Sequence, residues 1–222
     1  MTIIRSAALL TFTISLIAGC KPSPTVTTPT DAESSETVAL PTAAPEPDAA
    51  ECIAGLEEAG AKLKKDGDGL VIEADFRGLT IGDSALEYLI GLRRVRSILL
   101  NETGVTDAGM VTVGKVATLQ NVDLRDCTIS NAGLEPLAEL SQLKALRLSG
   151  KSGATSVDDD GLVHVAKMKN LKALMLDFLW ISEVGLEQLT GLDKLEELYL
   201  AKTLVGDDAL ATMSQFPRLK KL

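Results

Sequence analysis

The chain has 222 residues, of which 45% are hydrophobic and 3% aromatic, and its formal net charge at pH 7 is −9. This length and apolar content are sufficient for one sizeable core. The acidic balance argues against nucleic acid binding, which needs clustered Lys and Arg, and against a protein that lies on an anionic membrane surface.

Residues 1–19 have the features of a secretory signal peptide. Arg5 is the only charge before Cys20, and the apolar stretch from about Ala7 to Ala18 is too short to span a bilayer as a helix. The stretch ends in LIAGC at residues 16–20, which resembles the lipobox of bacterial lipoproteins. The resemblance implies that Cys20 is acylated, palmitate included, and becomes the first residue of a membrane-anchored chain. The alternative is an ordinary signal peptide with a cysteine there by chance.

Residues 20–50 are predicted to be a linker. Six of the eight prolines lie here among Thr, Ser and Ala, and few large apolar residues are present, so this segment cannot form a core. A flexible coil of this length extends roughly 30 Å on average, which would hold the following domain away from a bilayer. Lys21 follows Cys20 where inner-membrane lipoproteins of enteric bacteria carry Asp. The resemblance therefore favours the outer membrane, with the domain in the periplasm or at the cell surface.

Residues 51–70 are predicted to form an N-terminal cap. Cys52, Leu56 and Ala59 fall on one side of a short helix. The DGDG sequence at residues 66–69 separates two strand-like segments and predicts a hairpin turn. Such a cap would shield the first open face of a repetitive core.

A repeat begins at Val71 and continues to Leu222. Its opening residues are separated by steps of 24, 24, 28, 24 and 24 residues, at Val95, Leu119, Leu143, Leu171, Leu195 and Leu219. Within a unit, apolar residues first alternate as in a strand and then recur every three residues as in a helix. The predicted helix N-caps are Thr106, Ser130, Asp158 and Ser182, with Gly82 and Gly206 as weaker caps in the outer units. Residues 71–222 therefore contain six full units and a truncated seventh.

The segment Gly104–Met110 (GVTDAGM) and its copies resemble the I-T-D-x-G-L signature of leucine-rich repeats of the cysteine-containing or ribonuclease-inhibitor-like kind, as in bacterial leucine-rich repeat lipoproteins. The resemblance implies an α/β solenoid, a right-handed superhelix with parallel strands on the concave side and helices on the convex side. It is specific for the fold and says little about the ligand. No F-box precedes the repeats, so a ubiquitin-ligase role is not carried over.

Three motifs that suggest chemistry have simpler explanations. The segment Ala145–Ser152 matches a permissive phosphate-loop pattern, but it begins inside a predicted strand and no helix starts at Lys151. The run Asp158–Asp160 fits a helix cap and first turn better than a cation site. His164 is expected on the exposed face of a convex helix, with no nucleophile spaced to it. We expect no catalytic residue, no metal and no cofactor. Cys52 and Cys127 fall in different layers, so a disulfide between them is not expected.

The candidate partner-binding residues are Met175, Phe178, Trp180 and Tyr199. Aromatic residues are scarce in this chain, and Trp and Tyr are enriched at binding hot spots. Phe178 and Trp180 occupy loop positions, whereas Met175 and Tyr199 are predicted neighbours on the concave face. The four-residue insertion of the fourth unit, near Gly150–Ser156, would form one wall. The alternative is that Phe178 and Trp180 simply pack beneath this insertion.

The sequence therefore predicts a membrane-anchored, non-enzymatic module of the bacterial envelope that binds an unknown protein partner. The alternative is a structural envelope protein that associates with copies of itself. Leu219 and Leu222 begin a strand with no further unit to cover it, and Met213 and Phe216 need shielding. We expect a frayed end or weak self-association at this C-terminal edge.

Overall fold

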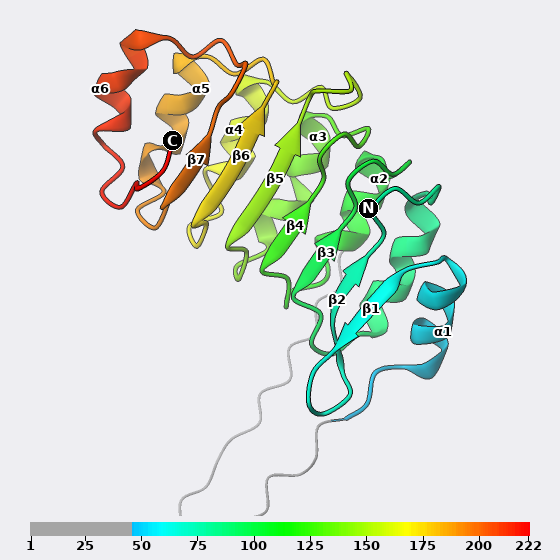
Figure 1. The fold of residues 1–222 in the computed structure, drawn as a ribbon. Coiled ribbons are helices and arrows are strands. Elements are labelled where there is room, and N and C mark those ends of the chain that lie inside the picture. Colours follow the sequence, from blue (N-terminus) through cyan, green and yellow to red (C-terminus); the bar gives the residue numbers. More distant parts are fainter. Residues whose placement is uncertain (1–45) are drawn as a thin grey trace, which may run out of the picture. The chain divides into compact units, whose positions relative to one another are not determined.

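The computed structural model describes residues 46–222; the predicted signal peptide, Cys20 and most of the predicted linker lie outside them. The described residues contain one seven-stranded sheet with the strands in chain order (Figure 1). The strands are β1 Lys62–Lys65, β2 Val71–Asp75, β3 Ser97–Leu99, β4 Asn121–Asp123, β5 Ala145–Ser149, β6 Ala173–Asp177 and β7 Glu197–Tyr199.

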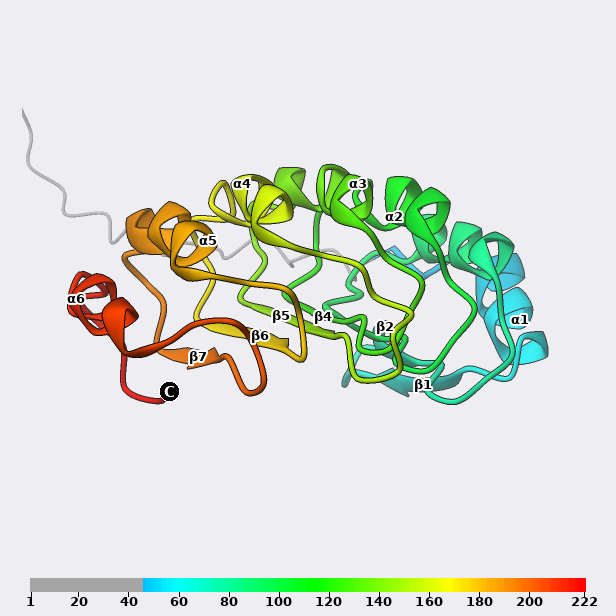
Figure 2. The same ribbon diagram turned by 90° about the horizontal axis from the view of Figure 1, so that it is seen from above.

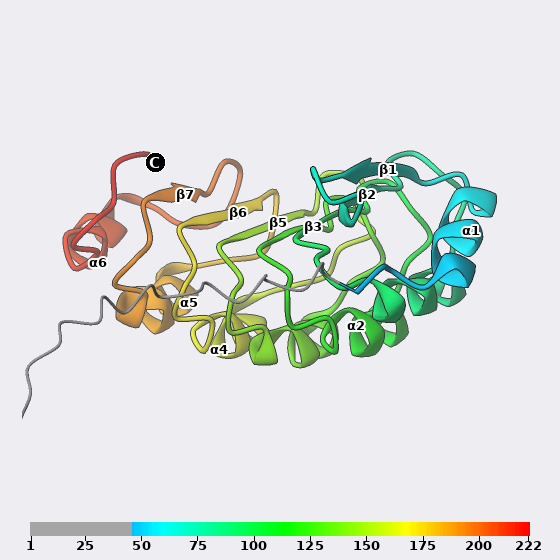
Figure 3. The same cartoon turned by 90° about the horizontal axis from the view of Figure 1, so that it is seen from below.

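Each parallel strand is followed by one or two short helical segments, which lie on one side of the sheet. The α-helices are α1 Ala50–Glu58, α2 Asp107–Val113, α3 Asn131–Leu134, α4 Leu162–Val165, α5 Glu183–Gln188 and α6 Leu210–Met213. The 3-10 helices are η1 Asp83–Gly91, η2 Pro136–Glu139, η3 Asp159–Gly161, η4 Leu189–Gly191 and η5 Asp207–Ala209. Figures 2 and 3 show an arc with the helices along its outer side and the sheet along its inner side. Residues 46–222 form a leucine-rich repeat solenoid.

The register of the sheet confirms the repeat period. The Cα partners Ala74, Ile98, Val122, Leu146, Leu174 and Leu198 run through the parallel strands one unit apart. These residues are fully buried, as are the unit-opening residues from Val71 to Leu195. Each unit therefore contributes its leucines to a core that is completed only by its neighbours.

The N-terminal end contains the predicted helix and hairpin. β1 pairs with β2 in antiparallel fashion, and the Asp66 carboxylate accepts bonds from the backbone N–H groups of Asp68 and Leu70 in the turn. α1 packs against η1 and buries Leu56. None of the helices within residues 46–222 is long and apolar enough to cross a membrane.

The predicted N-caps are confirmed. The side chains of Thr106, Ser130, Asp158 and Ser182 each accept a bond from the backbone N–H two residues later. Gly82 and Gly206 provide no side-chain cap. The helical segments therefore begin where the sequence places them.

A side-chain ladder links each cap to the preceding unit. Asp107, the first residue of α2, accepts from the N–H of Ser130 at 2.8 Å and from its hydroxyl at 2.5 Å. The bonds between Asp83 and Thr106, one unit before, and between Asp159 and Ser182, two units after, repeat this arrangement.

The ladder adapts where the cap residue changes. Where the cap is Asp158, the facing residue is Asn131, whose amide donates to the Asp158 carboxylate at 2.6 Å; a carboxylate there would face a like charge. Where the cap is Gly206, the longer Glu183 reaches its N–H at 2.7 Å. The charge and the length of the side chain that faces each cap therefore match the cap residue of the next unit.

Candidate functional site

The first half of the concave face is occupied by its own ion pairs. Arg77 contacts Asp75 at 2.8 Å and Arg125 contacts Asp123 at 2.7 Å. The Arg77 guanidinium beside Asp75 holds the pKa of that carboxyl below its usual range. Arg125 covers Asp123 so well that Asp123 is buried although it faces the concave side. These charges are already paired within the chain, so they offer a partner little uncompensated charge.

The second half of the concave face is less charged. Met175 and Tyr199 are direct Cα partners across β6 and β7, as predicted. They line a depression of about 120 Å³ together with Arg147, Ala173, Leu174 and Glu197. The Tyr199 hydroxyl donates to Glu197 at 3.2 Å. Both candidate side chains are half-buried.

Phe178 and Trp180 lie in the loop that follows β6, at the edge where the strands end. Trp180 is 71% exposed and Phe178 is 41% exposed. The alternative that Trp180 packs beneath the insertion is wrong, because most of its surface is open. The described structure thus brings Met175 and Tyr199 together on the concave face and holds Phe178 and Trp180 on the neighbouring edge.

Sequence reasoning missed two residues of this edge. Leu204 occupies the same repeat position as Trp180 in the next unit, and its N–H donates to the carbonyl of Ile181 at 2.9 Å. Leu204 is 58% exposed and Val184 is 64% exposed. In the earlier units the Trp180 position holds Thr80, Gly104, Thr128 and Ser156. Comparison of that position between units would have found Leu204. We define the Trp180 patch as Phe178, Trp180, Val184 and Leu204.

Phe178 adopts a backbone conformation that does not favour a bulky residue. Its φ is 61°, and the same slot in other units has positive φ at Glu102, Asp126 and Lys202. The left-handed region costs a bulky L-residue on the order of 1 kcal/mol or more, and Gly or Asn would relieve that strain. The exposed ring of Phe178 adds little to the core. A surface contact is therefore a better explanation for it than packing.

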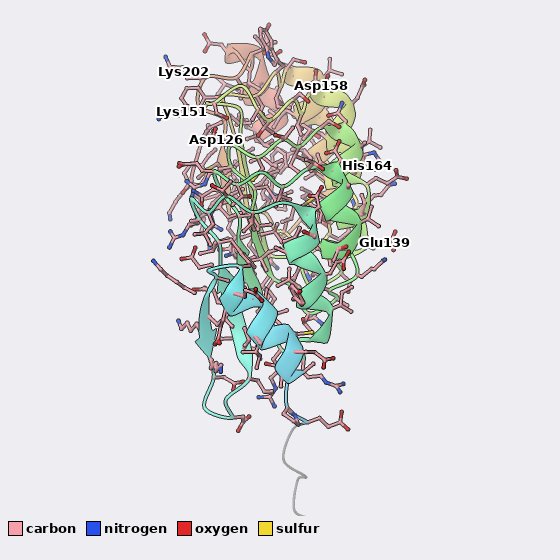
Figure 4. All side chains as sticks on the ribbon, turned by 90° about the vertical axis from the view of Figure 1, so that its right-hand side faces the viewer. Asp126, Glu139, Lys151, Asp158, His164 and Lys202 are labelled. Carbon is pink, nitrogen blue, oxygen red and sulfur yellow. The ribbon has the colours of Figure 1, made fainter. Side chains whose placement is uncertain are left out.

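The insertion of the fourth unit lies beside the patch. The N–H of Gly150 donates to the carbonyl of Asp177 at 3.1 Å, and a Cβ at Gly150 would overlap the Phe178 carbonyl oxygen. The N–H of Ser152 donates to Asp126 of the preceding unit at 2.8 Å. Lys151 is exposed on this loop, and Figure 4 shows it in the same upper part of the molecule as Lys202.

Charges are separated between the two edges of the sheet. The segments that lead from each helix to the next strand carry the residues that we call the basic edge: Arg93, Arg94, Arg96, Lys115, Lys144, Lys167, Lys169, Lys172, Lys194, Arg218 and Lys220. Asp193 and Glu196 are the acidic residues of these segments. The opposite edge, where helices begin, carries many acidic residues, including Asp107, Asp126 and the run Asp158–Asp160. The net charge of −9 for the whole chain does not show that basic residues are concentrated at one edge.

The motifs set aside from the sequence fit their structural explanations. Ala145–Ser149 is β5, and the next helical segment starts at Asp159. Asp158 caps that segment. Cys52 and Cys127 are free thiols, and burial raises the pKa of Cys127. Residues 46–222 hold no group of three or more His, Cys, Asp and Glu that could bind a metal ion.

The expectation for His164 is wrong in one respect. His164 lies on the helix side of the solenoid (Figure 4), but it is half-buried rather than exposed. Its Nδ1 is buried without a hydrogen-bond partner among the described residues, and so is Oε1 of Gln188. Gln188 occupies the same repeat position one unit later. Close stacking of neighbouring helices buries both side chains.

The C-terminal edge begins a further strand. Lys221 pairs with Glu197 in a parallel bridge, and Lys220 and Lys221 form ion pairs with Glu196 and Glu197 at 2.7 and 2.6 Å. Phe216 is buried, contrary to expectation, because it occupies the position of the core residue Leu192 of the previous unit. A groove of about 460 Å³ remains, with an apolar lining that includes Val205, Leu210, Met213 and Leu222.

Comparisons with protein-family models and with curated proteins found no match to this sequence. Solved structures of similar fold include internalin C2 of Listeria monocytogenes, at 16% identity and a TM-score of 0.47, over 79% of this chain and 92% of that one. Another is the leucine-rich repeat ectodomain of the Arabidopsis receptor kinase HAESA, solved with a peptide hormone, at 16% identity and a TM-score of 0.48. That match covers 71% of this chain and 30% of the ectodomain chain. Both similarities concern the fold alone.

Proposed function

We propose that this chain is a non-enzymatic, protein-binding leucine-rich repeat module, anchored to the bacterial envelope through acylated Cys20. The observation that carries the binding proposal is the Trp180 patch. Four apolar side chains from two adjacent units are exposed at 41% to 71%, at an edge where earlier units carry Thr, Ser or Gly at the Trp180 position. Exposed aromatic anchors of this kind dominate binding energy at protein interfaces.

The test is capture of the envelope partner by wild-type protein and by a Trp180→Ala, Leu204→Ser variant. Truncation of such anchors commonly costs about 2 kcal/mol or more, on the order of a thirtyfold loss of affinity. Because both side chains are mostly exposed, the melting temperature should stay within about 2 °C. Val111→Ala, which trims an exposed side chain on the convex helix α2, is the matched control and should bind as wild type. Equal capture by all three proteins would reject the patch.

The anchor is proposed from the LIAGC sequence at residues 16–20. Cys20→Ala removes the thiol that would be acylated, so the chain should leave the detergent phase and become soluble. Retention of the variant in the detergent phase would reject acylation at Cys20 and leave the patch proposal intact. The Lys21 residue after Cys20 supports the outer membrane as the destination.

A second candidate function is a structural envelope protein that associates with copies of itself. The groove at the C-terminal edge supports it, because Leu210 and Leu222 are each 66% exposed there. Sedimentation velocity over a concentration series tests this function. Concentration-dependent dimers that Leu210→Ser abolishes would favour self-association, and a monomer at all concentrations would reject it.

A further inference from the structure

We propose that the basic edge binds the anionic phosphate headgroups of a phospholipid bilayer. This surface lies along the sheet edge where the parallel strands begin, which is the lower edge in Figure 1. It is separate from the Trp180 patch, which lies where the strands end. The contact is an electrostatic one, distinct from any acyl anchor.

The centre of the basic edge is a shared depression. The N–H of Lys172 donates to the carbonyl of Lys144 at 2.7 Å, which sets these two lysines side by side in adjacent units. With Lys194 they line a hollow of about 280 Å³, completed by Ser141, Gln142 and Asn170. Three lysines and three neutral hydrogen-bonding residues thus line one depression. Lys is an effective binder of phosphate because it presents a compact positive charge with three donors.

These lysines keep most of their charge free. The ammonium of Lys144 donates to the amide oxygen of Gln120 at 2.9 Å, and that of Lys194 donates to the amide oxygen of Asn170 at 2.5 Å. A neutral oxygen satisfies one donor but leaves the positive charge uncompensated. Lys172 lies 3.5 Å from Glu196, which is also held by Lys220 at 2.7 Å. One carboxylate therefore compensates two lysines, so the surface around the hollow keeps a net positive charge that would attract a phosphate group.

The chain also enters the solenoid at this edge. The Asp48 carboxylate accepts bonds from the N–H groups of Val71 and Arg93, each at 2.7 Å. Glu46 pairs with Arg93 at 2.8 Å. The segment that leads from Cys20 therefore joins the solenoid beside the first residues of the basic edge. A tether attached on this side favours the approach of this edge to the bilayer.

This orientation is compatible with the proposed partner binding at the Trp180 patch and with the proposed anchor at Cys20. The strand-end edge, with its acidic residues and the Trp180 patch, would point away from the bilayer toward a partner. The two edges are separated by the length of the strands and by the loops at both ends. That separation exceeds the Debye length of about 8 Å at physiological salt, so the acidic edge would not cancel the attraction. The lipid contact itself does not depend on acylation of Cys20.

The test uses residues 20–222 with Cys20→Ser, which retains the whole solenoid and cannot be acylated. Sedimentation with vesicles of phosphatidylglycerol and phosphatidylcholine should carry the protein down, whereas pure phosphatidylcholine vesicles should not. Each lysine near an anionic surface contributes severalfold to the partition coefficient. The triple variant Lys144→Gln, Lys172→Gln, Lys194→Gln should therefore partition on the order of a hundredfold more weakly. Gln preserves most of the side-chain length and its hydrogen bonding.

The matched control is Lys151→Gln with Lys202→Gln, which removes charge from exposed lysines at the strand-end edge. This control should bind vesicles as wild type, and binding of both should vanish at about 0.5 M salt. Equal loss in the control and the triple variant, or equal binding to pure phosphatidylcholine, would overturn the proposal. Displacement by millimolar inorganic phosphate at constant ionic strength would assign the hollow to a soluble anion and overturn it as well. Because the protein carries no acyl chain, failure here would leave the Cys20 anchor untouched.

Discussion

Replacement of Gly133 by Ala tests the side-chain ladder between units. A Cβ on Gly133 would overlap Oδ1 of Asp107 and lie 3.0 Å from Cγ2 of Ile129, so the carboxylate must move. Asp107 would then lose its two bonds from Ser130. Two such bonds at a half-buried site stabilise by about 3 kcal/mol together, whereas Ala instead of Gly in a helix returns about 1 kcal/mol. The expected result is a net destabilisation of about 2 kcal/mol.

The assay is thermal and urea unfolding followed by circular dichroism, in which this loss corresponds to a fall of about 4–8 °C in melting temperature. Gly67→Ala is the control, because a Cβ there meets nothing within 4 Å. In an Asp107→Ala background the Gly133→Ala change should lose most of its cost, since the overlapping carboxylate is gone. Helix propensity alone predicts that Gly133→Ala stabilises the chain. A stabilised variant, or the same cost in both backgrounds, would refute the ladder.

Three further outcomes are expected. Lys220 and Lys221 hold the pKa values of Glu196 and Glu197 below their usual range. These ion pairs therefore stabilise the last strand above pH 4.5, and the stabilisation is lost as the pH falls through the lowered pKa values. Amide hydrogen exchange should rise first at the C-terminal edge, and unchanged protection there at pH 3 would contradict this. Alkylation of the native chain should modify half-exposed Cys52 before buried Cys127, with the order read by mass spectrometry; equal rates would be inconsistent with the buried thiol. Leu124→Asp should unfold the central units, because burial of an unpaired carboxylate costs several kcal/mol, whereas Gln142→Asp on the exposed side should shift the melting temperature little.

The 24-residue period was enough to predict the strands, the core leucines and the helix caps. These features depend on residues within one unit, and every unit repeats the same local constraint. Ser130, for example, caps its helix through a bond only two residues away. The division into cap and repeats agrees with the hairpin and the parallel register, and its exact boundaries stay a prediction, as do the signal peptide and linker.

Contacts between units were harder to predict. The bond from the N–H of Ser130 to the Asp107 carboxylate spans 23 residues and depends on how far one unit is displaced from the next. The same displacement buries His164. Within a single unit, Arg125 pairs with Asp123 two residues before it, so Arg125 is a partner of a buried carboxylate rather than a free surface charge. The repeat period predicts on which side of the solenoid a residue lies. It does not predict how much of the side chain the neighbouring unit buries.

The candidate site was predicted in part. The scarcity of aromatic residues pointed to Trp180 and Phe178, and both are exposed as a contact surface requires. Tyr199 and Met175 lie on the concave face and form a separate depression, so they need not contact the same partner. Val184 was missed because single Val residues are common in the repeats, and only its exposure distinguishes it. Leu204 was missed because the Trp180 position was not compared between units.

Site-specific photocrosslinking in living cells tests the central claim most directly. A photoreactive residue at position 204 sits in the Trp180 patch, and one at position 111 sits on the convex helix α2 with similar exposure of the native side chain. The account predicts a discrete crosslinked product from position 204 that is absent from position 111 and is lost when Trp180→Ala is added. Equal products from both positions, or a product from position 204 that survives Trp180→Ala, would contradict a binding function centred on this patch.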